Sequence, residues 1–112
     1  MKSYSVFVTP QALRHMAEIR QYVSGTLQAP DTARALLQTL REEMRALSSL
    51  PNRFPLTEEE PWRSNGLHRM LVKSFLVYYW VDEEQQAVRI IAVLYARRDQ
   101  KQALRSLDLA GN

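Results

Sequence analysis

The sequence predicts a small α+β domain in which a helical hairpin packs on one face of an antiparallel-rich sheet. The expected element order is β-α-α-β-β-β, followed by a short C-terminal helix. Three patterns support it: a strand-like segment at residues 4–9, two amphipathic helical patterns between residues 10 and 50, and three strand-like segments within residues 62–99. The chain has 112 residues and is 46% hydrophobic, which suits one domain over residues 1–112 with one core.

End signals mark the first strand and the first helix. Residues 4–9 read YSVFVT, and β-branched and aromatic side chains of this kind are typical of a strand. Thr9 and Pro10 then supply a helix N-cap and a proline at the first helical position. An apolar stripe follows, and Gly25 is expected to end this helix. The stripe consists of Ala12, Met16, Ile19 and Val23.

A second apolar stripe, from Ala33 to Leu47, predicts a second helix that begins near Pro30-Asp31 and ends before Pro51. Both stripes are short, so we interpret them as core-packing faces rather than coiled-coil or membrane-surface helices. Residues 51–66 have no period and contain the run Glu58–Glu60, which predicts a loop that is either functional or only solvated. Trp62, at its end, either plugs the edge of the core or caps a groove.

Residue alternation in the last strand predicts which side chains face the helices. The set of Val88, Ile90, Ala92 and Leu94 is uniformly apolar and is expected to point inward. Arg89, Ile91, Val93 and Tyr95 are then expected to point outward. A tight Lys73-Ser74 turn and a hairpin through residues 82–86 join the three strands, so neighbouring strands should pair antiparallel.

Composition excludes several classes of function. The chain has no cysteine and only two isolated histidines, His15 and His68, so we expect no metal, no cofactor and a structural role for both histidines. No apolar run of roughly 18 residues and no signal-peptide pattern is present, which predicts a cytoplasmic protein without a membrane partner. The net charge is +3, and residues 97–112 hold four basic residues against two acidic ones. This excess marks either a surface for an anionic partner or a solvated helix face.

The stretch WRSNGLHRMLVKSFLVYYWVDEEQQAVRIIAVLYARRD, residues 62–99, resembles the sheet of the RelE/ParE superfamily of toxins from bacterial toxin-antitoxin pairs. The resemblance extends upstream to SVFVTPQALRHMAEIRQYV and ARALLQTLREEMRALSSLP, so it covers nearly the whole chain. The order and spacing of these segments carry the resemblance, because the individual motifs are degenerate and hydrophobic.

The superfamily pattern implies faces for the other two strands. It places Leu76, Tyr78 and Trp80 inward, together with His68, Met70 and Val72 on the strand before. It places Arg69 and Leu71 outward. The resemblance also implies an antitoxin that covers an exposed apolar face, and we assign to that face Phe75, Val77, Tyr79, Ile91 and Val93. A hetero-oligomer with the antitoxin is therefore expected.

In RelE-like ribonucleases the outward face carries cationic and proton-transferring side chains that stabilise the phosphorane and protonate the leaving oxygen. Here Phe75 and Leu71 stand where those relatives have basic residues, and Tyr95 stands where many have histidine. If the chain is a ribonuclease, the candidate catalytic residues are Arg69, Tyr95, Arg97 and Arg98, with Tyr95 as the acid.

The apolar cleft and the Tyr-Ala-Arg-Arg-Asp terminus resemble the ParE branch, whose members poison DNA gyrase by trapping its cleaved-DNA complex. This implies a growth-inhibiting, plasmid-stabilisation-like toxin that is not an enzyme. Candidate target-binding residues, chosen by their charge, are Arg97, Arg98, Lys101 and Arg105. Alternatively, Arg98 and Asp99 form a structural ion pair, with Asp99 as the N-cap of the last helix. Three hypotheses stay open: a gyrase-binding toxin, an endoribonuclease that cleaves mRNA on or off the ribosome, and a degenerate binding module.

Overall fold

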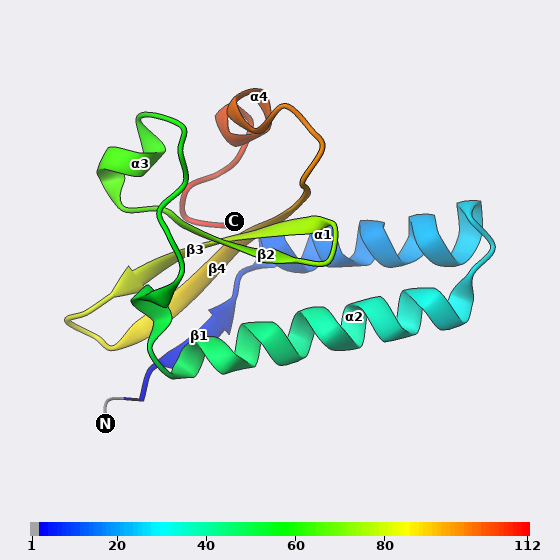
Figure 1. Ribbon diagram of the computed structural model, residues 1–112, viewed down its shortest axis with the longest axis horizontal. Helices are drawn as coiled ribbons and strands as arrows, with labels where there is room; N and C mark the ends of the chain where they lie inside the picture. The colour runs from blue at the N-terminus through cyan, green and yellow to red at the C-terminus, as the bar shows by residue number, and fades with distance from the viewer. Residues whose placement is uncertain (1–2) are drawn as a thin grey trace.

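A computed structural model of the chain describes residues 3–112. Strands and helices follow the predicted order, with additional short helical turns (Figure 1). The elements are β1 (Ser5–Val8), α1 (Pro10–Gln21), the π-helical turn η1 (Tyr22–Thr26), α2 (Pro30–Arg45), the 3₁₀ turns η2 (Ala46–Ser48) and η3 (Pro51–Arg53), α3 (Trp62–Asn65), β2 (His68–Val72), β3 (Phe75–Asp82), β4 (Ala87–Tyr95) and α4 (Gln100–Arg105).

The four strands form one sheet in the order β1-β4-β3-β2. β1 pairs in parallel with β4, whereas β4 with β3 and β3 with β2 pair antiparallel. The sheet is therefore antiparallel-rich, as predicted.

Local signals in the sequence set the helix ends. The Thr9 side chain accepts a hydrogen bond from the Ala12 backbone N–H, and Pro10 opens α1, which confirms the predicted cap. Helical structure continues through η1 to Thr26, one residue beyond the expected stop at Gly25. α2 begins at Pro30, as predicted.

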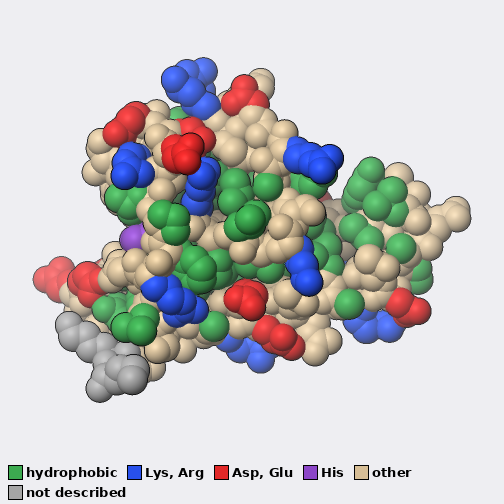
Figure 2. All heavy atoms as spheres, in the orientation of Figure 1, with side chains coloured by type: hydrophobic (Ala, Val, Ile, Leu, Met, Phe, Trp, Pro, Cys, Tyr) green, Lys and Arg blue, Asp and Glu red, His purple; other side chains and the backbone are tan. Residues whose placement is uncertain are grey.

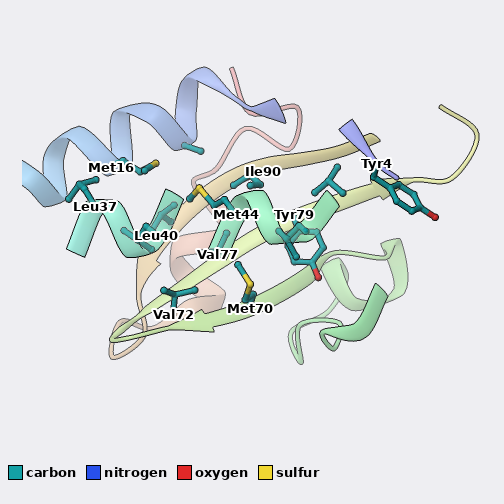
Figure 3. Packing of buried hydrophobic residues seen from close by; sticks show 14 residues of the cluster. Tyr4, Met16, Leu37, Leu40, Met44, Met70, Val72, Val77, Tyr79 and Ile90 are labelled. Carbon is teal, nitrogen blue, oxygen red and sulfur yellow. The ribbon is translucent and has the colours of Figure 1, made fainter. Parts of the chain in front are cut away.

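The α1–α2 hairpin covers one face of the sheet, where the two helices lie side by side (Figure 1). Figure 3 shows Met16 of α1 and Leu40 of α2 close to the sheet residues of this layer. The buried members of this first layer include Leu37, Met44, Met70, Val72, Val77, Tyr79, Val88, Ile90 and Val93. Burying such side chains contributes about 1.5–3 kcal/mol each, so this layer is a main source of stability.

The opposite face of the sheet is covered as well, by α3 and α4 (Figure 1). Trp62 is 6% exposed and packs in this second layer, so it fills the edge of the core, and it also lines a groove beside Lys101 and Arg105. The other buried members are Leu67, Leu76, Tyr78, Ile91, Ala92, Leu94, Ala103 and Leu104. The prediction of one core was therefore wrong: the sheet separates two apolar layers, because the short helices around residues 62–65 and 100–105 supply a second cover.

The predicted faces of β3 were inverted. Phe75, Val77 and Tyr79 face the α1–α2 hairpin, and Leu76, Tyr78 and Trp80 face the second layer. Figure 3 shows Val77 and Tyr79 among the side chains of the first layer. The reason is the two-residue turn: it pairs Val72 with Phe75 and Met70 with Val77, and paired residues point to the same face. The predicted faces of β2 were right, since Met70 and Val72 pack toward the hairpin.

β4 follows the prediction only up to Ile90. Tyr78 pairs with Ala92 while Tyr79 pairs with Ile90, so Ile91 is an extra residue and the strand bulges. Beyond the bulge the alternation is reversed: Ala92 and Leu94 face the second layer, and Val93 faces the hairpin.

The expected exposed apolar face is consequently absent from residues 3–112. Val77, Tyr79 and Ile91 are fully buried, Val93 is 3% exposed, and Phe75 is only partly buried. The five residues assigned to antitoxin binding also lie on two faces, with Ile91 opposite the others. The expectation that these five residues form one exposed face was wrong, because β3 is inverted, β4 bulges and a second layer covers the other face.

Candidate functional site

A basic turn connects β4 to α4 and carries Arg97 and Arg98, both exposed. Within residues 3–112 neither arginine makes an ion pair, so the predicted alternative of an Arg98–Asp99 pair is not formed. Asp99 does cap α4: its Oδ1 accepts a hydrogen bond from the Gln102 backbone N–H at 3.2 Å. α4 then presents Lys101 and Arg105 to solvent, one helical turn apart. Figure 2 shows Lys and Arg side chains projecting around α4 and the preceding turn.

Gln100 is a site residue that the sequence analysis missed. It is 9% exposed, and the Tyr78 hydroxyl donates a hydrogen bond to its Oε1 at 2.7 Å. Its Nε2 donates to the carbonyl oxygens of Arg98 at 2.9 Å and Tyr95 at 3.0 Å. A glutamine inside a charged run gives no sequence signal of burial, because glutamine is mostly exposed in proteins.

The four candidate catalytic residues do not converge on one site. Tyr95 and Arg98 line one groove, whereas Arg69 lies apart from it. Arg69 lies on β2 opposite Tyr78, which pairs with Ala92, three positions before Tyr95 on β4. Three strand residues correspond to about 10 Å. Tyr95 also points to the other face of the sheet, where its ring lies 5.9 Å from that of Phe75. Arg97 and Arg98 belong to the turn beyond β4.

Arg69 is held by the loop that precedes β2. Its guanidinium lies 3.3 Å from a carboxylate oxygen of Glu58 and 3.9 Å from one of Glu59. The hydroxyl of fully buried Thr57 donates to the Glu59 carboxylate. The acidic run of this loop therefore neutralises the one cation of β2.

The two central tyrosines of β3 keep their protons at neutral pH. Burial raises the pKa of Tyr78, and the nearby Glu59 charge adds to this effect. Burial also raises the pKa of Tyr79 to about 12, and its hydroxyl donates to the Pro51 carbonyl oxygen at 2.6 Å. Both hydroxyls act as hydrogen-bond donors that hold distant segments, not as acids.

An apolar groove of about 630 Å³ lies between the outer end of the α1–α2 hairpin and the ends of β3 and β4. Tyr22 and Leu27 on its rim are 56% and 54% exposed. Figure 2 shows hydrophobic side chains gathered over this outer part of the hairpin. Other lining residues are Ile19, Leu36, Phe75, Val93 and Tyr95, with His15, Glu18 and Arg98 as the charged or titratable ones. Of the five residues first assigned to antitoxin binding, Phe75 and Val93 line this groove.

Both histidines make internal contacts. His15 Nδ1 accepts a hydrogen bond from the Val93 backbone N–H at 3.2 Å, and burial lowers the pKa of His15. One turn earlier on α1, Gln11 Nε2 donates to the Ile91 carbonyl oxygen at 2.8 Å. His68 stacks on Tyr79 and bonds through Nδ1 to the Phe54 carbonyl oxygen. Residues 3–112 hold no cluster of three or more metal-ligating side chains.

The family model described as "ParE toxin of type II toxin-antitoxin system, parDE" matches residues 6–100. The chain belongs to the ParE toxin family. No curated protein sequence matches it.

Solved structures of this ParE-family fold come from several bacteria. The chromosomal ParDE system of P. aeruginosa is similar with a TM-score of 0.70 and 17% identity, covering 87% of this chain and 100% of that chain. A mutant of the E. coli toxin RelE in the free state has a TM-score of 0.61 and 15% identity, over 94% of this chain and 99% of that one. The toxin-antitoxin complex RelBE2 from Mycobacterium tuberculosis has a TM-score of 0.58 and 23% identity, covering 85% of this chain and 93% of that chain. At these identities the likeness shows the fold alone.

Leu71 and Phe75 of this ParE-family chain stand where RelE-like ribonucleases are expected to have basic residues, and the two side chains lie on opposite faces of the sheet. Leu71 on β2 is 64% exposed and points away from the hairpin, whereas Phe75 borders the apolar groove on the hairpin side. The described part of the chain contains no helix long and apolar enough to cross a membrane.

Proposed function

We propose that this ParE-family chain is a growth-inhibiting toxin that is neutralised by a cognate antitoxin and acts in the bacterial cytoplasm by binding DNA gyrase. The observation that carries the proposal is the family match over residues 6–100, whose description names the parDE toxin-antitoxin system. A plasmid-stabilisation role follows from the same pairing of toxin and antitoxin.

The arrangement of cations favours a binding protein over a ribonuclease. Cleavage of RNA requires preorganised cations around the phosphorane and a base close to the attacking hydroxyl. Arg69 is instead engaged by Glu58 and Glu59, and Tyr95 lies on the other face of the sheet. Of the three candidate arginines, only Arg98 shares a groove with Tyr95, so Arg69, Arg97 and Arg98 do not form a catalytic cluster.

The basic turn and α4 supply the target-binding surface of the proposal. Arg97, Arg98, Lys101 and Arg105 are exposed cations within one short segment. Such a segment attracts acidic protein surfaces and DNA phosphates, both of which a cleaved gyrase–DNA complex presents.

The apolar groove is the proposed antitoxin site. Its exposed Tyr22, Leu27 and Tyr95 suit the apolar side of an amphipathic helix, and Arg98 at its border suits a carboxylate of that helix. The toxin-antitoxin description of the family argues for this occupant. Because Arg98 also belongs to the basic turn, a bound antitoxin would cover part of the target-binding surface.

Purified chain added to DNA gyrase tests the target. The expected result is loss of supercoiling with accumulation of cleaved DNA, while ribosome-bound mRNA stays intact. The second candidate is an endoribonuclease, favoured by Tyr95 and Arg98, a candidate acid and a cation that line one groove. Mapped mRNA cuts together with normal supercoiling would favour that candidate. A chain that binds an antitoxin without affecting growth would be a degenerate binding module.

A further inference from the structure

Gln100 is the one buried side chain in the exposed run 97–102. Its carboxamide is both a donor and an acceptor, and burying such a group without partners costs free energy. Its hydrogen bonds therefore identify what the side chain holds in place.

The carboxamide joins the sheet to the basic turn. On the sheet side, Oε1 accepts from the hydroxyl of Tyr78, which is fully buried on β3. On the turn side, Nε2 faces three carbonyl oxygens, those of Arg98 at 2.9 Å, Tyr95 at 3.0 Å and Ala96 at 3.4 Å. A fixed side chain of the core thus anchors a turn that otherwise projects into solvent.

The backbone of the turn is bonded on both sides of this anchor. The Ala96 N–H donates to the Ser74 carbonyl oxygen at 2.8 Å, and the Arg98 N–H donates to that of Tyr95 at 3.1 Å. With three carbonyl groups directed at the carboxamide, the side chains of Arg97 and Arg98 remain on the outside. The turn has one well-defined shape although its side chains are exposed.

We propose that Gln100, held by Tyr78, is the positioning residue of the target-binding surface, because it fixes the arrangement in which Arg97 and Arg98 are presented. The inference rests on the proposed function, in which these arginines bind the target. A surface that is ordered before binding loses less entropy in the complex, so its affinity is higher. Charge alone is then insufficient for activity.

Glutamine is specifically required at this position. Glutamate has the same shape but would turn a carboxylate oxygen toward the three carbonyl oxygens, with no N–H to donate. Removal of the Tyr78 hydroxyl would leave Oε1 of the buried carboxamide without its donor.

The test compares Gln100→Glu with Gln102→Glu, which makes the same charge change at an exposed position of α4. Growth inhibition after induction and hydrogen exchange of the backbone amides are measured for both. For Gln100→Glu we expect growth inhibition to fall by about tenfold or more, the size of effect that loss of ~1.4 kcal/mol of binding produces. Its Ala96 and Arg98 amides should exchange faster, while amides of β3 and β4 stay protected. Gln102→Glu should match the wild-type chain in both.

Tyr78→Phe is the milder second variant, used if Gln100→Glu fails to fold, and it should change both readouts in the same direction. The inference is overturned if Gln100→Glu inhibits growth as the wild-type chain does, or if exchange at Ala96 and Arg98 is unchanged. A wild-type chain that inhibits growth without affecting gyrase would refute the proposed target, yet the comparison of variants would still decide the role of Gln100.

Discussion

Ile90 and Ile91 are adjacent residues of β4 that point to opposite faces, and both are fully buried. Alternation along the strand correctly predicted that they face opposite ways. It did not predict that Ile91 is buried, because only one covering layer was expected.

Truncation of either isoleucine should therefore cost stability. We expect Ile90→Ala and Ile91→Ala each to lower the free energy of unfolding by about 2–5 kcal/mol, since each leaves a cavity in a packed layer. Denaturant unfolding measures this, with Leu71→Ala, 64% exposed on β2, as the control with little effect. A cost for Ile91→Ala as small as for Leu71→Ala would contradict the second layer.

His15 makes stability depend on pH. Its pKa is lowered in the folded chain mainly by burial; Arg14 and Arg98 also lower it, against Glu18. The unfolded chain then binds a proton more readily, so stability is lost as pH falls below about 6.5 toward the folded pKa.

Replacement His15→Asn tests this dependence, because asparagine retains an acceptor for the Val93 N–H but does not titrate. Melting temperatures between pH 7.5 and 5 should fall less steeply for His15→Asn than for the wild-type chain. If the melting temperatures of the two chains fall equally steeply with pH, His15 does not contribute to the pH dependence of stability.

At the scale of elements, hairpin geometry determines which face each residue takes. The pairing of Val72 with Phe75 follows from the two-residue Lys73-Ser74 turn, so the faces of β3 were predictable from sequence once those of β2 were assigned. The bulge at Ile91 was not predictable, because its surroundings are uniformly apolar and either register buries hydrophobic side chains. The caps at Thr9 and Asp99 were predictable, since they depend on neighbouring residues alone.

Growth inhibition should depend on the two arginines of the basic turn, Arg97 and Arg98. Arg97→Ala combined with Arg98→Ala should abolish growth inhibition, because it removes the exposed charge of the turn while leaving its backbone bonds intact. Tyr95→Phe, which removes only a hydroxyl, should retain it. Growth curves after induction measure both variants. Loss of activity in Tyr95→Phe, with mRNA cuts on ribosomes, would favour the ribonuclease.

At the scale of the whole molecule, the apolar groove and the exposed cations of α4 are separate surfaces. The apolar groove lies at the outer end of the hairpin, whereas Lys101 and Arg105 lie on α4 in the second layer, and Arg98 is common to both regions. Contacts between segments far apart in sequence create this division, which is why local patterns located the basic residues but not the groove.

Antitoxin binding should respond to changes at the groove rim. Leu27→Asp should weaken binding by about tenfold or more, because it places a charge in an apolar contact. Leu50→Asp, a comparably exposed leucine outside the groove, should not. Calorimetric titration with the antitoxin measures the difference, and cells with Leu27→Asp should no longer be protected. Equal affinities for the two variants would place the antitoxin elsewhere.

The polar side chains of α1 have a further consequence for a chain without its partner. β1 ends at Val8, opposite Ile90, so β4 continues beyond its neighbour and would expose an open sheet edge. At that edge the Gln11 side chain donates a hydrogen bond to the Ile91 carbonyl oxygen, and the His15 side chain accepts one from the Val93 N–H. These two side chains take the place of a further strand. A free edge is a template on which another chain can add a strand and begin an aggregate. Because side chains of α1 already bond these backbone groups, a second copy of the chain cannot pair a strand with them and begin an aggregate there.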